Sequence, residues 1–547
     1  MTVRVTVGVP VSALGASPPR FASTPQRLRV FGQTLCRRIA SSADVSVYTR
    51  VVRGATASLP GGEPMKSTLL KLLVALFTLS LVAAACGSDD DTADSGDSDA
   101  LAEAEAALAA AEDAIEAAEA EAAEAQAAAE AAASDGGDTN PLAGTAVRIT
   151  GPVRSPAEVA GLMGALDAFA EANDMTIFYV GSADWESEIN VQIEAGTPPD
   201  ISIFPQPGKL ADFARDGFLV PLPDDVTAAV SENWSAGAMG FGNVDGTQYG
   251  VPDKTDLKSL VWYQPARFEA NGYKVPTTLD ELFGLAETMI ADGNTPFCIG
   301  IESGTATGWT FTDWVEDMML RRHSGETYDA WTTGELPFAS DEVSGVMQEV
   351  LDVWNTPGMV YAQGGTIAST SFRDNGEPLV NGDCMMHRQA SFFSSFFPDG
   401  TPVQDGSEGA IDVFGFPLGD TDPPIVLTSG TLVGAFNERP EVMAVMEYFG
   451  SPEFANLRQS AQREAKGGGD VLSGFNTANL NVDRSLWSPL AQSFLEVMAN
   501  NDVRFDGSDL MPADVGAGSF WTEGTALVNG EKTVAEAAAA IDATWPE

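Results

Sequence analysis

Histidine, serine and cysteine carry much of the covalent chemistry of proteins, but this chain of 547 residues places them in no familiar catalytic spacing. His323 and His387 are its two histidines, which excludes a metal site built from several imidazoles. The spacings His-Glu-Xaa-Xaa-His, Gly-Xaa-Ser-Xaa-Gly and Gly-Lys-Ser/Thr do not occur. Acidic residues number 78, so chance carboxylate pairs are expected, and no motif selects two of them. We predict a non-enzymatic protein without metal or cofactor.

Residues 65–86 have the composition of an export signal. Met65 and Lys66 form a basic start, residues 69–82 are mostly apolar, and three alanines precede Cys86. This segment resembles a bacterial lipoprotein signal, in which Cys86 is acylated and becomes the mature N-terminus, although Ala83 stands where leucine is more usual. The alternative is a membrane-spanning anchor, for which a run of about 17 residues is the lower limit. We expect a lipid anchor on the outer face of the cytoplasmic membrane, at the cell surface or in the periplasm.

The segments around this signal differ in composition. Residues 1–64 contain eight Arg and no Lys, and they precede a complete signal, so we interpret them as a misannotated extension; a basic N-terminal domain is the alternative. Residues 86–100 read as a disordered acidic tether. Residues 101–133 are almost pure Ala and Glu with a thin heptad seam, which predicts a helical spacer or a coiled-coil contact. Residues 134–144 form a linker.

Charge excludes several kinds of partner. Of the 29 basic and 78 acidic residues, residues 1–85 hold ten and two, which leaves 19 and 76 and a formal charge of −57 for the mature chain. Such a charge argues against binding to nucleic acid or to anionic lipid surfaces. Cys298 and Cys384 remain in the body of the chain, and in an oxidising compartment they are expected to form a disulfide; two buried free thiols are the alternative.

The remainder of the chain begins with alternating strands and helices. Strands are predicted at residues 146–150, 176–180 and 201–204, and helices at 156–169, 186–194 and 209–216. This alternation predicts a parallel α/β sheet. About 400 residues are too many for one compact core, so we expect two lobes.

Several short motifs of residues 145–547 together resemble the family 1 extracellular solute-binding proteins, the sugar receptors of ABC importers. The motifs occur at residues 195–200, 217–222, 251–252 with 260–268, 272–281, 381–386 and 520–545, and residues 203–208 look most like the α-glucoside receptors of that family. The resemblance implies two α/β lobes with a ligand cleft between them. Lobe one would comprise residues 145–265 and 426–475, and lobe two residues 266–425 and 476–547.

The same resemblance implies that the ligand is a carbohydrate, whose rings stack on aromatic side chains. The candidate ligand-binding residues are Trp185, Gln206, Trp309, Trp314, Gln389, Phe392, Thr431 and Trp521, whereas Trp262 is expected in the core. The implied partners are the permease subunits in the membrane, and the protein is expected to be a monomer unless residues 101–133 self-associate. The rival interpretations are an exported glycoside hydrolase and an envelope structural protein.

Overall fold

The computed structural model describes residues 140–404, 406–417 and 424–546. The predicted extension, signal peptide, lipidated Cys86, acidic tether, helical spacer and the first part of the linker lie outside these residues. No helix in the described ranges has the length and apolar character needed to span a membrane.

The first of two large sheets contains the strands predicted at the start of the body. Its order is β13-β12-β3-β1-β2, with β6 also paired to β12. The strands are β1 Ala146–Gly151, β2 Thr176–Gly181, β3 Ile201–Phe204, β6 Gly250–Leu257, β12 Ile425–Ala435 and β13 Asp502–Phe505. Strand β1 is parallel to β2 and β3, as predicted, whereas β12 is antiparallel to β3 and β6.

Helices cover both faces of this sheet because neighbouring strand residues point to opposite faces. Ile203 belongs to a core shared with α5, α16 and α17, whereas Phe204 belongs to a core shared with α6 and α7. The helices of this lobe are α5 Pro156–Ala172, α6 Trp185–Glu194, α7 Pro207–Arg215, α8 Asp224–Ser231, α9 Ala236–Gly240, α16 Pro440–Phe449 and α17 Pro452–Ala465, beside a hairpin of β4 Asn243–Val244 and β5 Thr247–Gln248. The predicted Ser155 cap begins α5, since its side chain accepts a hydrogen bond from the amide of Glu158.

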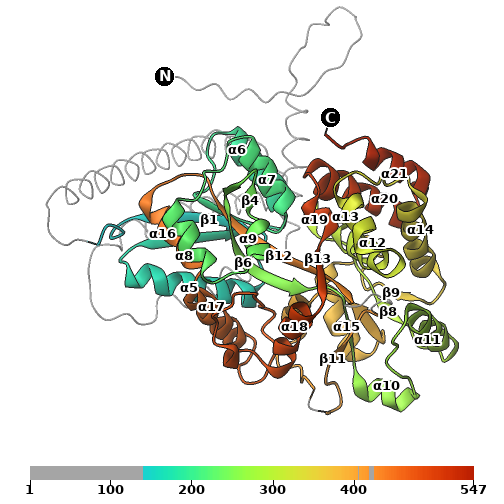
Figure 1. Ribbon diagram of the computed structural model, residues 1–547. Helices are drawn as coiled ribbons and strands as arrows, with labels where there is room; N and C mark the ends of the chain where they lie inside the picture. Colours follow the sequence, from blue (N-terminus) through green and yellow to red (C-terminus); the bar gives the residue numbers. More distant parts are fainter. Residues whose placement is uncertain (1–139, 405, 418–423, 547) are drawn as a thin grey trace, which may run out of the picture. The chain divides into compact units, whose positions relative to one another are not determined.

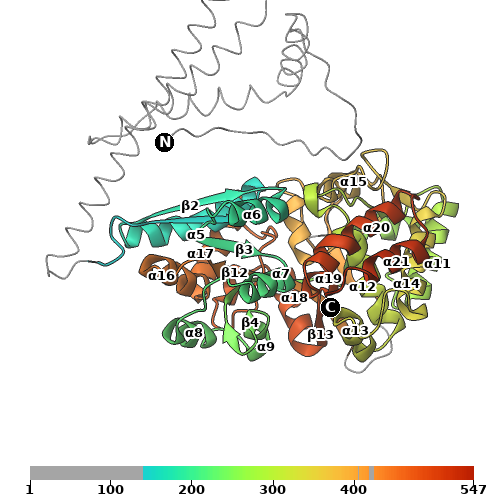
Figure 2. The same cartoon turned by 90° about the horizontal axis from the view of Figure 1, so that it is seen from above.

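The second sheet has the order β11-β7-β10-β8-β9. Its strands are β7 Leu260–Tyr263, β8 Phe297–Cys298, β9 Val360–Tyr361, β10 Met386–Arg388 and β11 Asp412–Gly415. The surrounding helices are α10 Pro265–Asn271, α11 Leu279–Ala291, α12 Trp309–Arg322, α13 Gly325–Thr332, α14 Asp341–Asn355, α15 Gly376–Asn381, α20 Trp521–Val528 and α21 Val534–Asp542. Figures 1 and 2 show these helices beside the first sheet and its helices.

The chain crosses between the sheets at a few places. Strand β6 ends at Leu257, and β7 begins at Leu260 in the second sheet. Strand β7 therefore pairs in the second sheet and β13 in the first, although the expected ranges assign them to lobes one and two respectively. Helices α18 Pro489–Asn500 and α19 Gly507–Leu510 flank β13, and the π-helical segment η5 Asp514–Phe520 leads into α20. Below, a lobe means one sheet with the elements packed on it.

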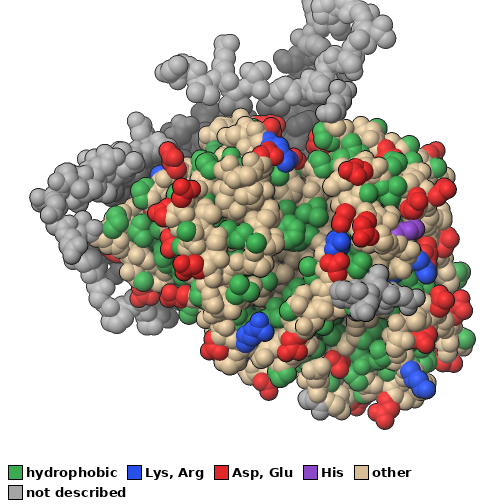
Figure 3. Space-filling view, in the orientation of Figure 1, with side chains coloured by type: hydrophobic (Ala, Val, Ile, Leu, Met, Phe, Trp, Pro, Cys, Tyr) green, Lys and Arg blue, Asp and Glu red, His purple; other side chains and the backbone are tan. Residues whose placement is uncertain are grey.

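A disulfide joins Cys298 of β8 to Cys384, with their Cα atoms 5.4 Å apart. Both cysteines are buried. Acidic side chains are spread over the surface shown in Figure 3, in keeping with the formal charge of −49 for the whole chain.

Candidate ligand-binding site

A cavity of about 170 Å³ lies between elements of the two lobes. From lobe one it is lined by residues that follow β1 and β3, by the start of α6, and by Glu158 of α5. These segments follow the carboxyl ends of parallel strands, the edge at which α/β sheets bind ligands. The crossing strands β6 and β12 contribute Lys254, Asp256 and residues 429–431. Lobe two contributes α12, α20 and the short helices η1 Gly304–Ala306, η2 Phe372–Asn375 and η3 Ser391–Phe396.

Lobe two supplies an aromatic wall. Its members are Trp309, Phe372, Phe392, Phe396 and Trp521. The ring of Trp309 packs at 4.9 Å, edge to face, on Phe372 and at 6.0 Å on Phe392. Phe396 also meets Phe372 and Phe392 edge to face, so four of the five rings are in contact. These rings offer the cavity apolar faces on which the C–H face of a sugar ring can stack.

Gly308 permits the two tryptophan segments to approach each other. It has a φ of +115° at the start of α12, a conformation that side chains rarely adopt. A Cβ atom at this position would also clash with the carbonyl oxygen of Trp521. The glycine before Trp309 therefore meets a steric requirement of the site.

An ion-paired lysine lies where the aromatic wall meets the crossing segment. Lys258 donates to Asp506 and, at 2.6 Å, to Asp313, and its ammonium lies 5.4 Å from the centre of the Trp309 ring. Burial alone would lower the pKa of Lys258, but the two carboxylates raise it above its ordinary value. Lys258 is therefore a fixed positive charge beside the wall.

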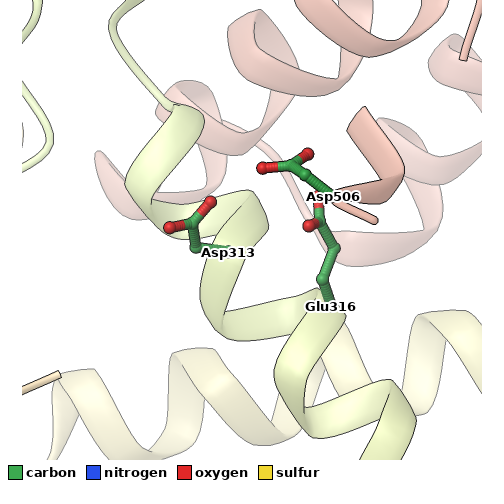
Figure 4. A group of neighbouring side chains, drawn as sticks. All are labelled: Asp313, Glu316 and Asp506. Carbon is green, nitrogen blue, oxygen red and sulfur yellow. The ribbon is translucent and has the colours of Figure 1, made fainter. Parts of the chain in front are cut away.

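Asp313 and Glu316 project from α12 towards Asp506, and single oxygens of the three lie within 4.8 Å of one another (Figure 4). The Lys258 ammonium already supplies a cation to Asp313 and Asp506. Burial, reinforced by Asp506, raises the pKa of Glu316 well above its ordinary value and so favours a neutral carboxyl. Asp313 and Asp506 therefore form an ion-pair network with Lys258, and the three carboxyl groups need no metal ion to balance their charge.

Five of the predicted ligand residues line this cavity. They are Gln206, Trp309, Phe392, Thr431 and Trp521. The side-chain oxygen of buried Gln206 accepts no hydrogen bond from any described residue. Thr431 already donates to Asp253 at 2.9 Å. Trp521 is only 3% exposed and its indole nitrogen donates to Ser508, so this side chain supports the fold as well as the cavity.

The structure places the other three predicted ligand residues away from the cavity. Trp185 begins α6 but turns under the helix, where its indole nitrogen donates to Ser202 and its ring meets Phe204 edge to face. Trp314 lies in the core of lobe two, and Gln389 is buried with its side-chain oxygen bonded to the amide of Ala390. Trp262 is fully buried, as predicted.

Sequence reasoning missed the charged lining. Arg154, Glu158, Lys254, Lys258, Arg373, Arg458 and Asp506 all border the cavity. No local pattern distinguishes them from solvated charges. The one local hint was Arg373, which follows Phe372 directly in the sequence.

A second cavity, of about 490 Å³, lies elsewhere along β6 and β12. It is lined by aliphatic and polar residues together with Phe241 and Phe505, whose rings pack on each other at 4.5 Å. It shares Lys254 with the first cavity and is also lined by Arg484, but it lacks the wall of several rings and the acidic residues of the first cavity. The smaller cavity is therefore the better candidate for a polar ligand.

Residues 155–456 match the model of a family described as bacterial extracellular solute-binding protein. The chain belongs to this family. It is 38% identical over 419 residues to the alpha-glucosides-binding periplasmic protein AglE of Rhizobium meliloti, covering 74% of this chain and 88% of the relative. It is 34% identical to the osmoprotective compounds-binding protein GgtB of a Synechocystis strain, covering 70% of this chain and 88% of the relative.

Solved structures of sugar-binding proteins share the fold. The maltose-bound MalE3 of T. maritima has a TM-score of 0.57 at 18% identity and covers 73% of this chain and 98% of its own. A chitin oligosaccharide binding protein has a TM-score of 0.59 at 17% identity and covers 74% of this chain and 98% of its own. These likenesses support the α/β architecture with two lobes.

Proposed function

We propose that this protein is the receptor of an ABC importer and binds a carbohydrate, an α-glucoside or an oligosaccharide, in the cavity between its lobes. The observation that carries the proposal is the aromatic wall of lobe two, which faces polar loops at the carboxyl ends of the parallel strands of lobe one. AglE, at 38% identity, supports the α-glucoside as the first ligand to test.

Binding needs no covalent step. A ligand that contacts both lobes binds a closed arrangement more tightly than an open one and so favours closure. The permease subunits would then recognise the closed receptor and accept the sugar. In this role the carboxylates of the cavity accept hydrogen bonds from sugar hydroxyls and do not act as acid and base.

A thermal-shift screen against neutral and acidic mono- and oligosaccharides tests the proposal. A ligand at 100 times its Kd stabilises the folded protein by about 2.7 kcal/mol, which is easily measured as a rise in Tm. Calorimetry on the best ligand would then give the affinity. If no carbohydrate in the panel shifts the Tm, the proposed function is wrong.

Incubation of the purified protein with the same oligosaccharides separates a receptor from a glycoside hydrolase. We expect the sugars to be recovered intact at stoichiometric protein concentration. Cleavage products that disappear in a Glu158→Gln or Asp256→Asn variant would instead establish a hydrolase.

We further propose that Cys86 carries the lipid that holds the receptor at the membrane, with residues 101–133 as a spacer. Cys86→Ala should release the folded protein into the medium or periplasm with its sugar affinity unchanged. Metabolic labelling with a fatty-acid probe should mark the wild type and not the variant; an unlabelled wild type contradicts the anchor. Deletion of residues 101–133 should leave binding unchanged, whereas loss of binding would favour a structural role for that segment.

A further inference from the structure

The charge of the cavity differs from that of the rest of the chain. The whole protein has a formal charge of −49, and the face in Figure 3 shows scattered acidic side chains with few basic ones. Five cationic residues nevertheless line the cavity: Arg154, Lys254, Lys258, Arg373 and Arg458. Five acidic residues line it too, so the cavity is balanced in formal charge whereas the chain as a whole is strongly acidic.

Three of these five cations are neutralised by partners. Lys254 pairs with Asp256 at 3.0 Å, and Arg458 pairs with Asp253 at 2.7 Å. Lys258 pairs with Asp313 and Asp506. Their charges are therefore accounted for within the protein.

Arg154 and Arg373 are different. Among the described residues, neither guanidinium makes an ion pair or donates a hydrogen bond, and the Nε of Arg373 is buried without an acceptor. Arg154 follows β1 in lobe one, and Arg373 lies on η2 in lobe two. The two unpaired cations thus border the cavity from opposite lobes.

The surroundings of Arg373 hold it in place without neutralising it. Its guanidinium carbon lies 5.1 Å from the ring centre of Phe372 and 4.7 Å from that of Phe396. Burial, together with weaker repulsion from Arg154, lowers the pKa of Arg373 to about 10 against the attraction of Glu158. The guanidinium stays charged at neutral pH in a site that disfavours its charge.

The remaining acids of the lining do not neutralise this pair. Burial raises the pKa of both Glu186 and Asp509, so each carboxylate is disfavoured. Asp256 and Asp506 are already paired with lysines. Glu158 is the lining acid that attracts Arg373, and its side chain already accepts a hydrogen bond from Ser155. Glu302 and Asp374 attract Arg373 more weakly from outside the lining, and none of the three forms an ion pair with it.

We propose that the physiological ligand is an acidic sugar derivative, whose carboxylate or phosphate lies between Arg154 and Arg373 while its ring packs on the aromatic wall. The planar guanidinium donates two parallel hydrogen bonds to either anion. An anion held from both lobes also relieves their mutual repulsion and favours closure. The inference rests on the proposed carbohydrate function and narrows its ligand class.

Matched pairs of sugars test the inference by calorimetry on the full mature chain. The pairs are maltose with maltobionate, and methyl α-glucoside with methyl α-glucuronide; α-glucose 1-phosphate tests the phosphate. We expect at least one acidic probe to bind ten times more tightly than its neutral partner, with an affinity that falls as salt is raised.

Substitution of the arginines assigns the preference to this pair. Arg373→Gln and Arg154→Gln should each remove most of the preference for the acidic probe while changing the Kd of the neutral probe less than threefold. Arg484→Gln is the matched control, because Arg484 is exposed, borders the second cavity and not this one, and makes no ion pair among the described residues. It should leave both affinities unchanged, and circular dichroism should show all three variants folded.

The outcomes separate the two proposals. If neutral probes bind as tightly as the acidic ones, or if the arginine variants weaken both equally, the acidic ligand is wrong and the carbohydrate receptor stands. If neither kind of sugar binds the wild type, the proposed function fails, and the inference fails with it.

Discussion

Trp309 and Trp314 lie five residues apart on α12, yet their surroundings are opposite. Trp309 is partly exposed and lines the cavity, whereas Trp314 is 3% exposed and meets Phe297, Trp354 and Phe416 edge to face. Five residues of α-helix rotate a side chain by about 140°, so the two rings cannot both face one cavity. The same residue type therefore serves binding at the cavity wall and packing in the interior.

The largest expected effect is in the interior. Trp314→Ala should lower the free energy of unfolding by about 3–5 kcal/mol, since it leaves a void among three aromatic neighbours. Urea unfolding measures the loss, and Trp309→Ala is the matched control on the same helix. If the Trp314 variant is as stable as the wild type, the assignment of Trp314 to packing and Trp309 to binding is wrong.

Removal of the Cys298–Cys384 disulfide should also destabilise the interior of lobe two. The double variant Cys298→Ala/Cys384→Ala should lose roughly 2–5 kcal/mol, because the bridge constrains the unfolded chain over a separation of 86 positions. Unfolding curves measure the loss, and mass mapping without reductant establishes the bridge in the exported protein. Two thiols that react with an alkylating agent in the native protein would contradict it.

Buried His387 makes the stability of the protein depend on pH. Burial lowers its pKa to about 4; its Nδ1 is bonded to the carbonyl of Cys298, and Nε2 has no partner among the described residues. In the unfolded chain His387 binds a proton below about pH 6.5, whereas in the folded chain it does so only below about pH 4. The free energy of unfolding therefore falls by on the order of 3 kcal/mol as the pH is lowered from 6.5 to 4.

His387→Gln should remove this part of the acid sensitivity. The free energy of unfolding measured at pH 7 and at pH 4.5 should then differ less in the variant than in the wild type. An unchanged difference would show that other groups control acid unfolding, and a His323→Gln variant controls for a histidine outside this contact.

The smallest expected effect is at the cavity wall. Trp309→Ala should weaken binding of the best sugar by about 1–3 kcal/mol, as for a desolvated aromatic anchor, with little loss of stability. Calorimetry and urea unfolding on the same sample separate the two quantities. Trp521→Ala should lower both, since that ring is buried as well as cavity-lining. If the Trp309 variant binds the sugar normally but unfolds at a lower urea concentration, Trp309 has a packing role like that of Trp314.

Local patterns of the sequence were sufficient for the elements and for part of the site. The alternation of residues 146–216 predicted three strands and the helices between them, because caps and hydrophobic period are encoded within a few residues. The Gly-Trp pair at 308–309 and the position of Trp521 marked two residues of the aromatic wall. These two residues could be recognised because a glycine turn and a family motif are both patterns of neighbouring residues in the sequence.

Only the tertiary structure decided which side chains face the cavity and which charges remain unpaired. The sequence does not reveal that Trp185 turns under α6, or that β7 and β13 pair with the sheets they do, because these depend on contacts between distant segments. The pairing of the cavity arginines also depends on contacts between distant segments. Arg458 forms an ion pair with Asp253 across 205 positions, whereas Arg154 and Arg373 border one cavity without an ion pair among the described residues. Residue counts along the chain do not reveal this difference.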